Sequence, residues 1–213
     1  MSLLKSYKDR EPPEPLRGFE HINRYWDNQN CMFAAKILPG EYYVTNKHER
    51  IVTVLGSCVA ACIRDRISGI GGMNHFMLPV DSLSGSWDMD GFGVATRFGN
   101  VAMERLINDI LKNGGRRQNL EVKLFGGGNV LVNMTDIGQK NILFVKHFAK
   151  TEGLKVIAED LGDVYPRKVH YIPSSGKVFV KRFHSIHNNT INEREQKYLK
   201  SIKHQNDGSI DLF

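Results

Sequence analysis

The chain contains little cysteine and has no long apolar run, and these two shortages exclude several classes of protein. Its 213 residues include three cysteines, Cys31, Cys58 and Cys62. A small, odd number of thiols does not suit a disulfide framework, so we expect free thiols in a reducing compartment. No segment approaches 18 uninterrupted apolar residues, and the N-terminal residues lack the apolar stretch of a secretory leader. We therefore expect a cytoplasmic protein with no direct membrane insertion.

The sequence also lacks a concentrated basic patch and the common nucleotide-binding motifs. It has 29 Lys and Arg residues against 23 Asp and Glu residues, a formal net charge of +6. The basic residues are spread along the chain, with the closest pairs at Arg116-Arg117 and Lys181-Arg182, whereas nucleic-acid binders gather them with aromatic residues. GxGxxG and GxxxxGK[ST] are both absent. We predict no nucleic-acid partner and no nucleotide cofactor, although a mildly cationic surface suits an acidic protein partner.

Length and composition predict one domain with an appendage at each end. A chain of this size with 41% hydrophobic residues can bury a substantial core. Residues 1–30 are rich in charge and contain Pro12, Pro13 and Pro15, which predicts a flexible or peripheral N-terminal lead. Residues 31–183 form the expected main domain. Residues 184–213 are a polar C-terminal extension, in which NEREQKYLK predicts a peripheral helix.

Hydrophobic periodicity predicts an α/β domain. Residues 97–113 and 139–152 have helical spacing of apolar side chains and are followed by glycine. The segments expected to form strands are rich in β-branched residues or alternate in polarity, and they lie at 31–45, 51–55, 59–65, 71–79, 120–130, 155–163 and 167–183. The last range reads as a hairpin around Pro173-Ser174-Ser175-Gly176. Because hairpin connections are too short for parallel crossovers, we expect largely antiparallel (mixed) β-sheets with at least two packed α-helices.

The stretch LGSCVAACIRDRISGIGGMNHFMLP, residues 55–79, places one cysteine and one histidine in two apolar strands. A turn centred on Arg66-Ile67 makes Cys58 and His75 direct partners in the antiparallel pair, with Cβ atoms roughly 4.5–5.5 Å apart. A slip of one residue would place them on opposite faces. The thiol and the imidazole ring are therefore predicted to be in contact.

A thiol next to an imidazole is the arrangement of a cysteine nucleophile. An adjacent imidazolium stabilises the thiolate, which then attacks a carbonyl carbon. The backbone N–H groups near Gly56 and Ser57 are candidate donors to the resulting oxyanion. The glycine loop at Gly126 and Gly127 is a candidate wall of the substrate groove, because glycine lets a substrate approach the backbone, and Phe76 is a candidate floor of the groove.

Two other readings of the same residues stay open at this point. Cysteine is commonly buried, and a lone histidine in an apolar run is commonly a core residue with its polar atoms satisfied. Zinc is the other alternative, with Cys58, Cys62 and His75 as ligands and His48 or Cys31 as the fourth. The paired Cys-x-x-Cys arrangement of structural zinc sites is missing, so no metal is predicted.

The motifs LGSCVAAC and GGMNHFMLP resemble those of the CheD family of chemoreceptor glutamine deamidases. The similarity extends to GFEHINRYWD at 18–27, AKILPGEYYVT at 35–45, KLFGGGNV, AEDLGD and the hairpin blocks RKVHY and SGKVFVK. It covers roughly residues 18 to 183. The resemblance implies a three-layer sandwich similar to the catalytic domain of cytotoxic necrotizing factor toxins. It also implies a protein-glutamine glutaminase that converts receptor glutamines to glutamates without a cofactor.

The resemblance further assigns roles to individual residues. Cys58 matches the family's nucleophile and His75 its general base and acid. Thr53 is the nearest equivalent of a threonine that assists the site, but it precedes Cys58 by five positions rather than six, which points it to the other side of a regular strand. Asp163 stands where a second glycine is common.

The resemblance also implies partners. Cytoplasmic helices of chemoreceptors, the methyl-accepting chemotaxis proteins, would be the substrate, and a CheC-type phosphatase would be a possible partner. The alternative is a non-catalytic adaptor that binds the receptor or CheC.

Overall fold

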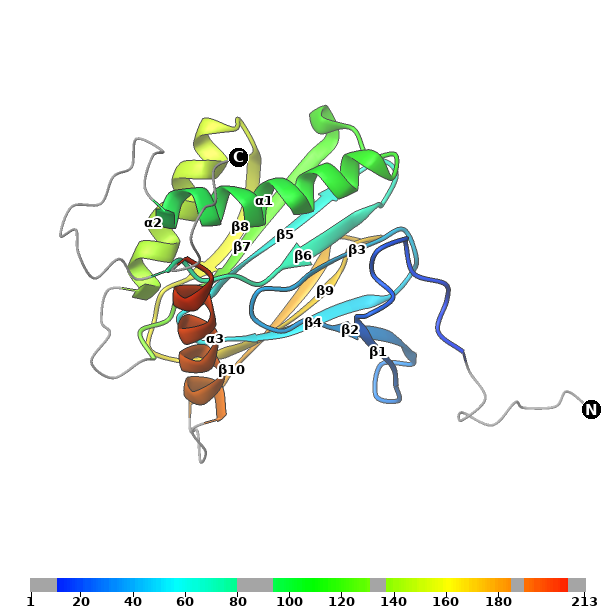
Figure 1. Cartoon of the computed structure of the whole chain (residues 1–213). Coiled ribbons are helices and arrows are strands. Elements are labelled where there is room, and N and C mark those ends of the chain that lie inside the picture. The colour runs from blue at the N-terminus through cyan, green and yellow to red at the C-terminus, as the bar shows by residue number, and fades with distance from the viewer. Residues whose placement is uncertain (1–10, 80–93, 131–136, 185–189, 207–213) are drawn as a thin grey trace, which may run out of the picture.

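The computed structural model describes residues 11–79, 94–130, 137–184 and 190–206. Two five-stranded sheets pack face to face, and α1 (Val94–Lys112) and α2 (Ile137–Thr151) cover the outer face of one of them (Figure 1). The layers are therefore helices, sheet and sheet, which confirms the predicted mixed α/β sandwich. The similarity to cytotoxic necrotizing factors stays a prediction.

The sheet beneath the helices has the order β3-β6-β5-β7-β8. Its strands are β3 (Tyr42–Thr45), β6 (Gly71–Asn74), β5 (Val59–Asp65), β7 (Leu120–Gly126) and β8 (Lys155–Leu161). The β7–β8 pair is parallel and the other three pairs are antiparallel. A parallel pair needs a long crossover, and α2 supplies it. Six of the seven residues of β5 are buried, which explains its nearly continuous apolar sequence.

The second sheet has the order β1-β2-β4-β9-β10. Its strands are β1 (Asn23–Asp27), β2 (Met32–Lys36), β4 (Arg50–Leu55), β9 (Arg167–Ile172) and β10 (Lys177–Arg182). The predicted hairpin is confirmed, because Ile172 pairs with Lys177 across the turn. β2 pairs with β4 in parallel, so β3 leaves this sheet and joins the other.

Helix α1 forms for the reason that its sequence suggests. Met103, Leu106 and Ile110 recur at helical spacing and are fully buried against the sheet. Each such side chain contributes about 1.5–3 kcal/mol through removal from water. The helix ends before Gly114, which has a φ of +103°. A short 3₁₀ turn (Arg117–Asn119) then leads into β7.

Packing extends beyond residues 31–183 at both ends. β1 pairs along its whole length with β2, and Phe19 and Ile22 before it are buried. At the other end, α3 (Thr190–Asn206) buries Leu199 and Ile202. This helix is not peripheral, in contrast to the expectation from its charged sequence, because it lies across one end of the sheets (Figure 1).

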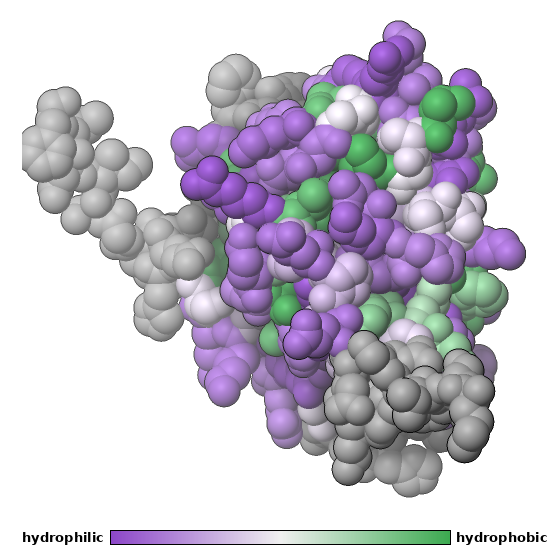
Figure 2. All heavy atoms as spheres, turned by 90° about the vertical axis from the view of Figure 1, so that its right-hand side faces the viewer, coloured by the Kyte–Doolittle hydropathy of each residue, from purple (hydrophilic) through white to green (hydrophobic). Residues whose placement is uncertain are grey.

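Hydrophilic residues predominate on the side of the molecule that Figure 2 shows, and apolar residues are scattered in small areas between them. Isolated apolar residues of this kind are normal on a protein surface. Within the described residues, no helix combines the length and the apolar character needed to cross a bilayer.

The register of the β5–β6 pair differs from the predicted register by two positions. Arg64 pairs with Gly71 and Cys62 with Met73, which centres the turn on Ile67-Ser68 rather than on Arg66-Ile67. The direct partner of Val59 is Phe76. Cys58 and His75 are therefore diagonal neighbours rather than directly opposite. A shift of two keeps both on the same face, so the predicted proximity survives.

Candidate active site

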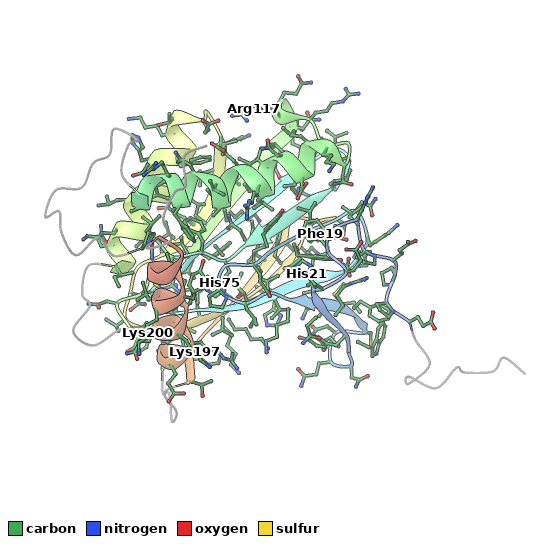
Figure 3. All side chains as sticks on the ribbon, viewed as in Figure 1. Phe19, His21, His75, Arg117, Lys197 and Lys200 are labelled. Carbon is green, nitrogen blue, oxygen red and sulfur yellow. The ribbon has the colours of Figure 1, made fainter. Side chains whose placement is uncertain are left out.

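Cys58 and His75 meet at the end of the sheets that α3 covers. Cys58 immediately precedes β5, and His75 immediately follows β6. The sulfur of Cys58, a ring nitrogen of His75 and a carboxylate oxygen of Glu195 all lie within 4.8 Å of one another. Figure 3 shows His75 between the sheets and α3, the helix that carries Glu195. The predicted thiol and imidazole are thus together, and an acid that sequence reasoning did not identify is with them.

Thr53 reaches the site from the opposite sheet. Its Oγ1 lies 2.7 Å from Nδ1 of His75 and donates a hydrogen bond of 2.9 Å to the carbonyl oxygen of Ile37. Since the hydroxyl proton is used on Ile37, Nδ1 of His75 must be the donor to Thr53. Nε2 of His75 is then the basic nitrogen, and it has no hydrogen-bond partner among the described residues.

The spacing of Thr53 from Cys58 gave the wrong expectation for its orientation. A separation of five residues places Thr53 and Cys58 on opposite faces only if both residues lie on one regular strand. β4 ends at Leu55 in one sheet and β5 begins at Val59 in the other, so the chain turns at Gly56-Ser57. Strand alternation does not carry across that turn, and Thr53 points at the imidazole ring.

Three successive backbone N–H groups point at one carboxylate. The amide nitrogens of Gly56 and Cys58 lie 2.8 and 3.2 Å from Oε1 of Glu195. The amide nitrogen of Ser57 lies 2.9 Å from Oε2, and the Ser57 hydroxyl donates to the same oxygen at 2.6 Å. Convergent amides of this kind stabilise an oxygen that carries negative charge. The N–H groups of Gly56 and Ser57, the predicted oxyanion donors, thus point at the oxygens of a carboxylate.

The loop that carries these amides is fixed from behind by α2. The Asn141 side chain is fully buried, donates 2.8 Å to the carbonyl oxygen of Ser57 and accepts 2.8 Å from the amide of Leu78. It therefore ties the residues before β5 to those after β6. A buried asparagine whose NH2 group and carbonyl oxygen are both hydrogen-bonded has a structural purpose. The sequence offered no signal for it.

Gly126 and Gly127, the predicted groove residues, support the same loop. The amide of Gly127 donates to the carbonyl oxygen of Cys58 at 2.7 Å. Both glycines have positive φ, and a Cβ on Gly126 would lie 2.2 Å from the Cys58 carbonyl oxygen. The backbone at Gly126 therefore packs closely against that of Cys58. Glycine is required here by the approach of two protein segments.

Phe76, the predicted groove floor, is a core residue. Its side chain is 1% exposed, and its ring contacts the Phe144 ring at a centroid distance of 5.9 Å. It borders a small cavity of about 70 Å³ that His75 and Tyr198 also line. A larger cavity of about 310 Å³ reaches Thr53, His75 and Glu195 between the strands and α3. Space for substrate therefore lies on the α3 side of the site.

Burial keeps both reactive groups neutral in this closed arrangement. Burial, followed by the charge and the hydrogen bond of Glu195, raises the pKa of the Cys58 thiol well above its usual value. Burial lowers the pKa of His75 to about 3. Their side chains are 0% and 1% exposed, respectively. At neutral pH the pair is therefore a thiol facing an uncharged imidazole.

The residues considered from the sequence as zinc ligands do not form one site. Cys31 is exposed in the turn after β1, and Cys62 lies inside β5. Among the described residues, the grouping close enough to share an ion is Cys58, His75 and Glu195. Four donors already occupy the Glu195 oxygens, which have about four lone-pair sites between them. A metal ion at this point would have to displace those hydrogen bonds.

Comparison with known proteins identifies the family. A family model described as CheD chemotactic sensory transduction matches residues 77–182. A Halorhodospira halophila protein named "Probable chemoreceptor glutamine deamidase CheD" is 56% identical over 203 residues, which cover 94% of each chain. The chain belongs to the CheD family. A CheD protein of Hahella chejuensis with the same name is 51% identical over 207 residues, covering 97% of each chain.

The chain departs from the CheD pattern at Asp163, and the backbone conformation there explains why aspartate is tolerated. Asp163, at the position where the family resemblance leads us to expect glycine, has a φ of +69°. Its carbonyl oxygen accepts from the Asn129 amide at 2.7 Å, and its Oδ1 accepts from the Val164 amide at 2.6 Å. Aspartate tolerates left-handed backbone better than most residues, partly through such local hydrogen bonds.

Proposed function

We propose that this CheD-family chain is a protein-glutamine deamidase that acts on chemoreceptors. Relatives that share 51 to 56% identity over more than nine tenths of the chain are named for that activity. One observation carries the chemical assignment. The Cys58 thiol, the His75 ring and three backbone N–H groups converge on a point that already holds the carboxyl group of a glutamate. Glutamate is the product of glutamine deamidation.

The first half of the reaction forms a thioester. Nε2 of His75 takes the thiol proton, and Sγ of Cys58 attacks the side-chain carbonyl carbon of the glutamine. The carbonyl oxygen becomes negative and is held by the N–H groups of Gly56 to Cys58. As the carbon–nitrogen bond breaks, His75 returns its proton to the departing ammonia.

The second half releases glutamate. Water attacks the thioester carbon while Nε2 of His75 accepts its proton, and the carbon–sulfur bond breaks. Cys58 leaves as thiolate and regains the proton from His75. The balance is glutamine plus water giving glutamate plus ammonia, with no redox change. Thr53 takes no proton in this scheme, and it positions the ring by accepting from Nδ1 and donating to Ile37.

The setting of this reaction follows from the substrate. The cytoplasmic helices of chemoreceptors are the proposed target, which places the protein in the cytoplasm. A CheC-type phosphatase remains an expected partner on the strength of the family resemblance. The scheme uses protein groups and water, so it invokes no metal or cofactor.

Mass spectrometry of a receptor cytoplasmic fragment tests the activity. Each converted amide gains about 1 Da as NH2 becomes OH, and we expect wild type to produce this gain and Cys58→Ala to produce none. Cys62→Ala is the matched control, because Cys62 is also buried in the same region of the chain but lies outside the site. Identical spectra for wild type and Cys58→Ala would refute the enzyme and favour the receptor- or CheC-binding adaptor.

A further inference from the structure

Helix α3 lies over the site with an acid at the centre of its inner face. Leu199 and Ile202 on this face are 4% and 1% exposed, and Glu195 is 2% exposed. Lys197 and Lys200 are exposed on the same helix (Figure 3). The pattern is that of an amphipathic helix, except that a carboxylate lies among the apolar residues. Burying an ionised carboxylate is costly unless donors surround it.

The donors around Glu195 are those expected for the substrate's reacting group. Its Oε1 accepts from the amides of Gly56 and Cys58, and its Oε2 accepts from the amide and hydroxyl of Ser57. The thiol and the imidazole stand within 4.8 Å of the carboxylate oxygen. A glutamine side chain entering for deamidation needs the same two features, an amide cradle for its oxygen and a nearby sulfur.

With α3 in this position Glu195 occupies the N–H donors that the carboxamide of another side chain would need. Cys58 is fully buried, and the cavity of about 310 Å³ is bordered by Glu195 and Ile191 of α3 itself. Tyr198 closes the adjacent side, where its ring lies against Gly40. The negative charge of Glu195 also opposes ionisation of the thiol, because it raises the pKa of Cys58.

We propose that α3 is a tethered analogue of the reaction product, which inhibits the enzyme until a receptor helix displaces it. Glu195 occupies the position of the newly formed glutamate, and α3 occupies the position of the receptor helix that carries it. The inference rests on the proposed deamidase function and adds its control. It also defines the form of the substrate as a glutamine presented on an α-helix.

The proposal makes residue 195 a potential substrate. In Glu195→Gln the amide oxygen takes the place of Oε1, and the NH2 group replaces Oε2, which in wild type accepts from the amide and the hydroxyl of Ser57. The hydroxyl can accept from the NH2 group, whereas the Ser57 N–H cannot, so the side chain has to turn away from that N–H. Sγ of Cys58 then attacks the amide carbon, ammonia leaves with a proton from His75, and water cleaves the thioester. The chain thereby converts its own introduced glutamine to the wild-type glutamate.

Peptide mass spectrometry of Glu195→Gln is the first test. We expect residue 195 to gain about 1 Da, and the same residue to stay unchanged when Cys58→Ala is added. Gln196 is an internal control, because it is exposed on the same helix and should remain glutamine. If the amide introduced by Glu195→Gln stays intact under conditions in which wild type converts a receptor fragment, the inference is overturned and the deamidase stands. If wild type does not convert the receptor fragment but the amide introduced by Glu195→Gln is converted, only the assignment of the receptor as substrate is overturned.

Thiol alkylation tests whether α3 is displaceable. Leu199→Ala weakens the packing of α3, so iodoacetamide should modify Cys58 at least about tenfold faster than in wild type. Cys62 is a buried reference thiol and should stay protected. Lys200→Ala, an exposed change on the same helix, should have no effect. The turnover of receptor fragment should rise together with Cys58 reactivity. Unchanged Cys58 reactivity, or equal exposure of Cys58 and Cys62, would show that α3 is a fixed part of the core and refute the proposal.

Discussion

At the residue scale, the direction of one hydroxyl proton determines which nitrogen of His75 is basic. Thr53 donates to the carbonyl of Ile37 and therefore accepts from Nδ1. The ring is thus fixed in the tautomer that presents a free Nε2 to the thiol. The family resemblance pointed to Thr53, but the hydrogen bonds from His75 through Thr53 to Ile37 could not be derived from the sequence, because the contact between Thr53 and His75 crosses between two sheets.

Removal of this hydroxyl should slow catalysis more than it weakens binding. Thr53→Val removes the hydrogen bond that fixes the ring, a loss of about 1–3 kcal/mol, which corresponds to a kcat lower by roughly 5-fold to 150-fold. Thr53→Ser keeps the hydroxyl and should recover most of the rate. Steady-state kinetics on a receptor fragment would decide, and a higher KM with unchanged kcat in Thr53→Val would contradict the positioning role.

Asp163 gives a second prediction at this scale, one for stability. Its φ of +69° is a conformation that β-branched residues avoid. Asp163→Val should lower the free energy of unfolding by about 1–2 kcal/mol, whereas Asp163→Gly should not lower it. Urea denaturation measures both. Equal stability of the valine and glycine variants would show that backbone conformation is not the limiting factor there.

At the scale of elements, the strands and helices follow from the sequence, but one register does not. The β5–β6 turn is displaced by one residue because Asp65 caps it, accepting hydrogen bonds from the amides of Ile67 and Ser68. α3 was predicted as a helix, yet its role was missed because a charged segment reads as solvated surface. The spacing of Glu195, Leu199 and Ile202 on one face was the available signal.

The Asn141 side chain links α2 to the loop at residues 56–58, so its loss should affect both stability and catalytic rate. Asn141→Ala leaves the Ser57 carbonyl and the Leu78 amide unpaired, at a cost of about 1–3 kcal/mol each. We expect lower stability by urea denaturation together with a lower kcat, because the loop at residues 56–58, which we propose to hold the oxyanion, is loosened. Gln139→Ala is an exposed control on the same helix. A stability loss with full catalytic activity would separate Asn141 from the loop.

At the scale of the whole molecule, closure of α3 over the site should make stability depend on pH. Burial lowers the pKa of His75 to about 3, whereas an unfolded histidine has a pKa of about 6.5. Below pH 6.5 the unfolded chain therefore binds a proton that the folded chain refuses until about pH 3. The free energy of unfolding should fall as the pH falls through this range.

The expected size of this effect is about 2 kcal/mol between pH 7 and pH 5. His75→Gln should remove that component of the slope in urea denaturation. His170→Gln is the comparison, because burial also lowers the pKa of His170 to about 4. This residue lies on a more open surface, where solvent screens its effect on the pH dependence of stability. A His75→Gln profile as steep as that of wild type would contradict the description of His75 as buried and neutral.

In the proposed mechanism a receptor glutamine becomes covalently attached to Cys58 during turnover. Acid-quenched mass spectrometry of the protein with a receptor fragment is the most direct measurement of it. We expect a thioester adduct on the Cys58 peptide, lighter than the sum of the two partners by one ammonia, about 17 Da, and absent in Cys58→Ala. Conversion of glutamine by wild type and Cys58→Ala alike, with no adduct at Cys58, would contradict it.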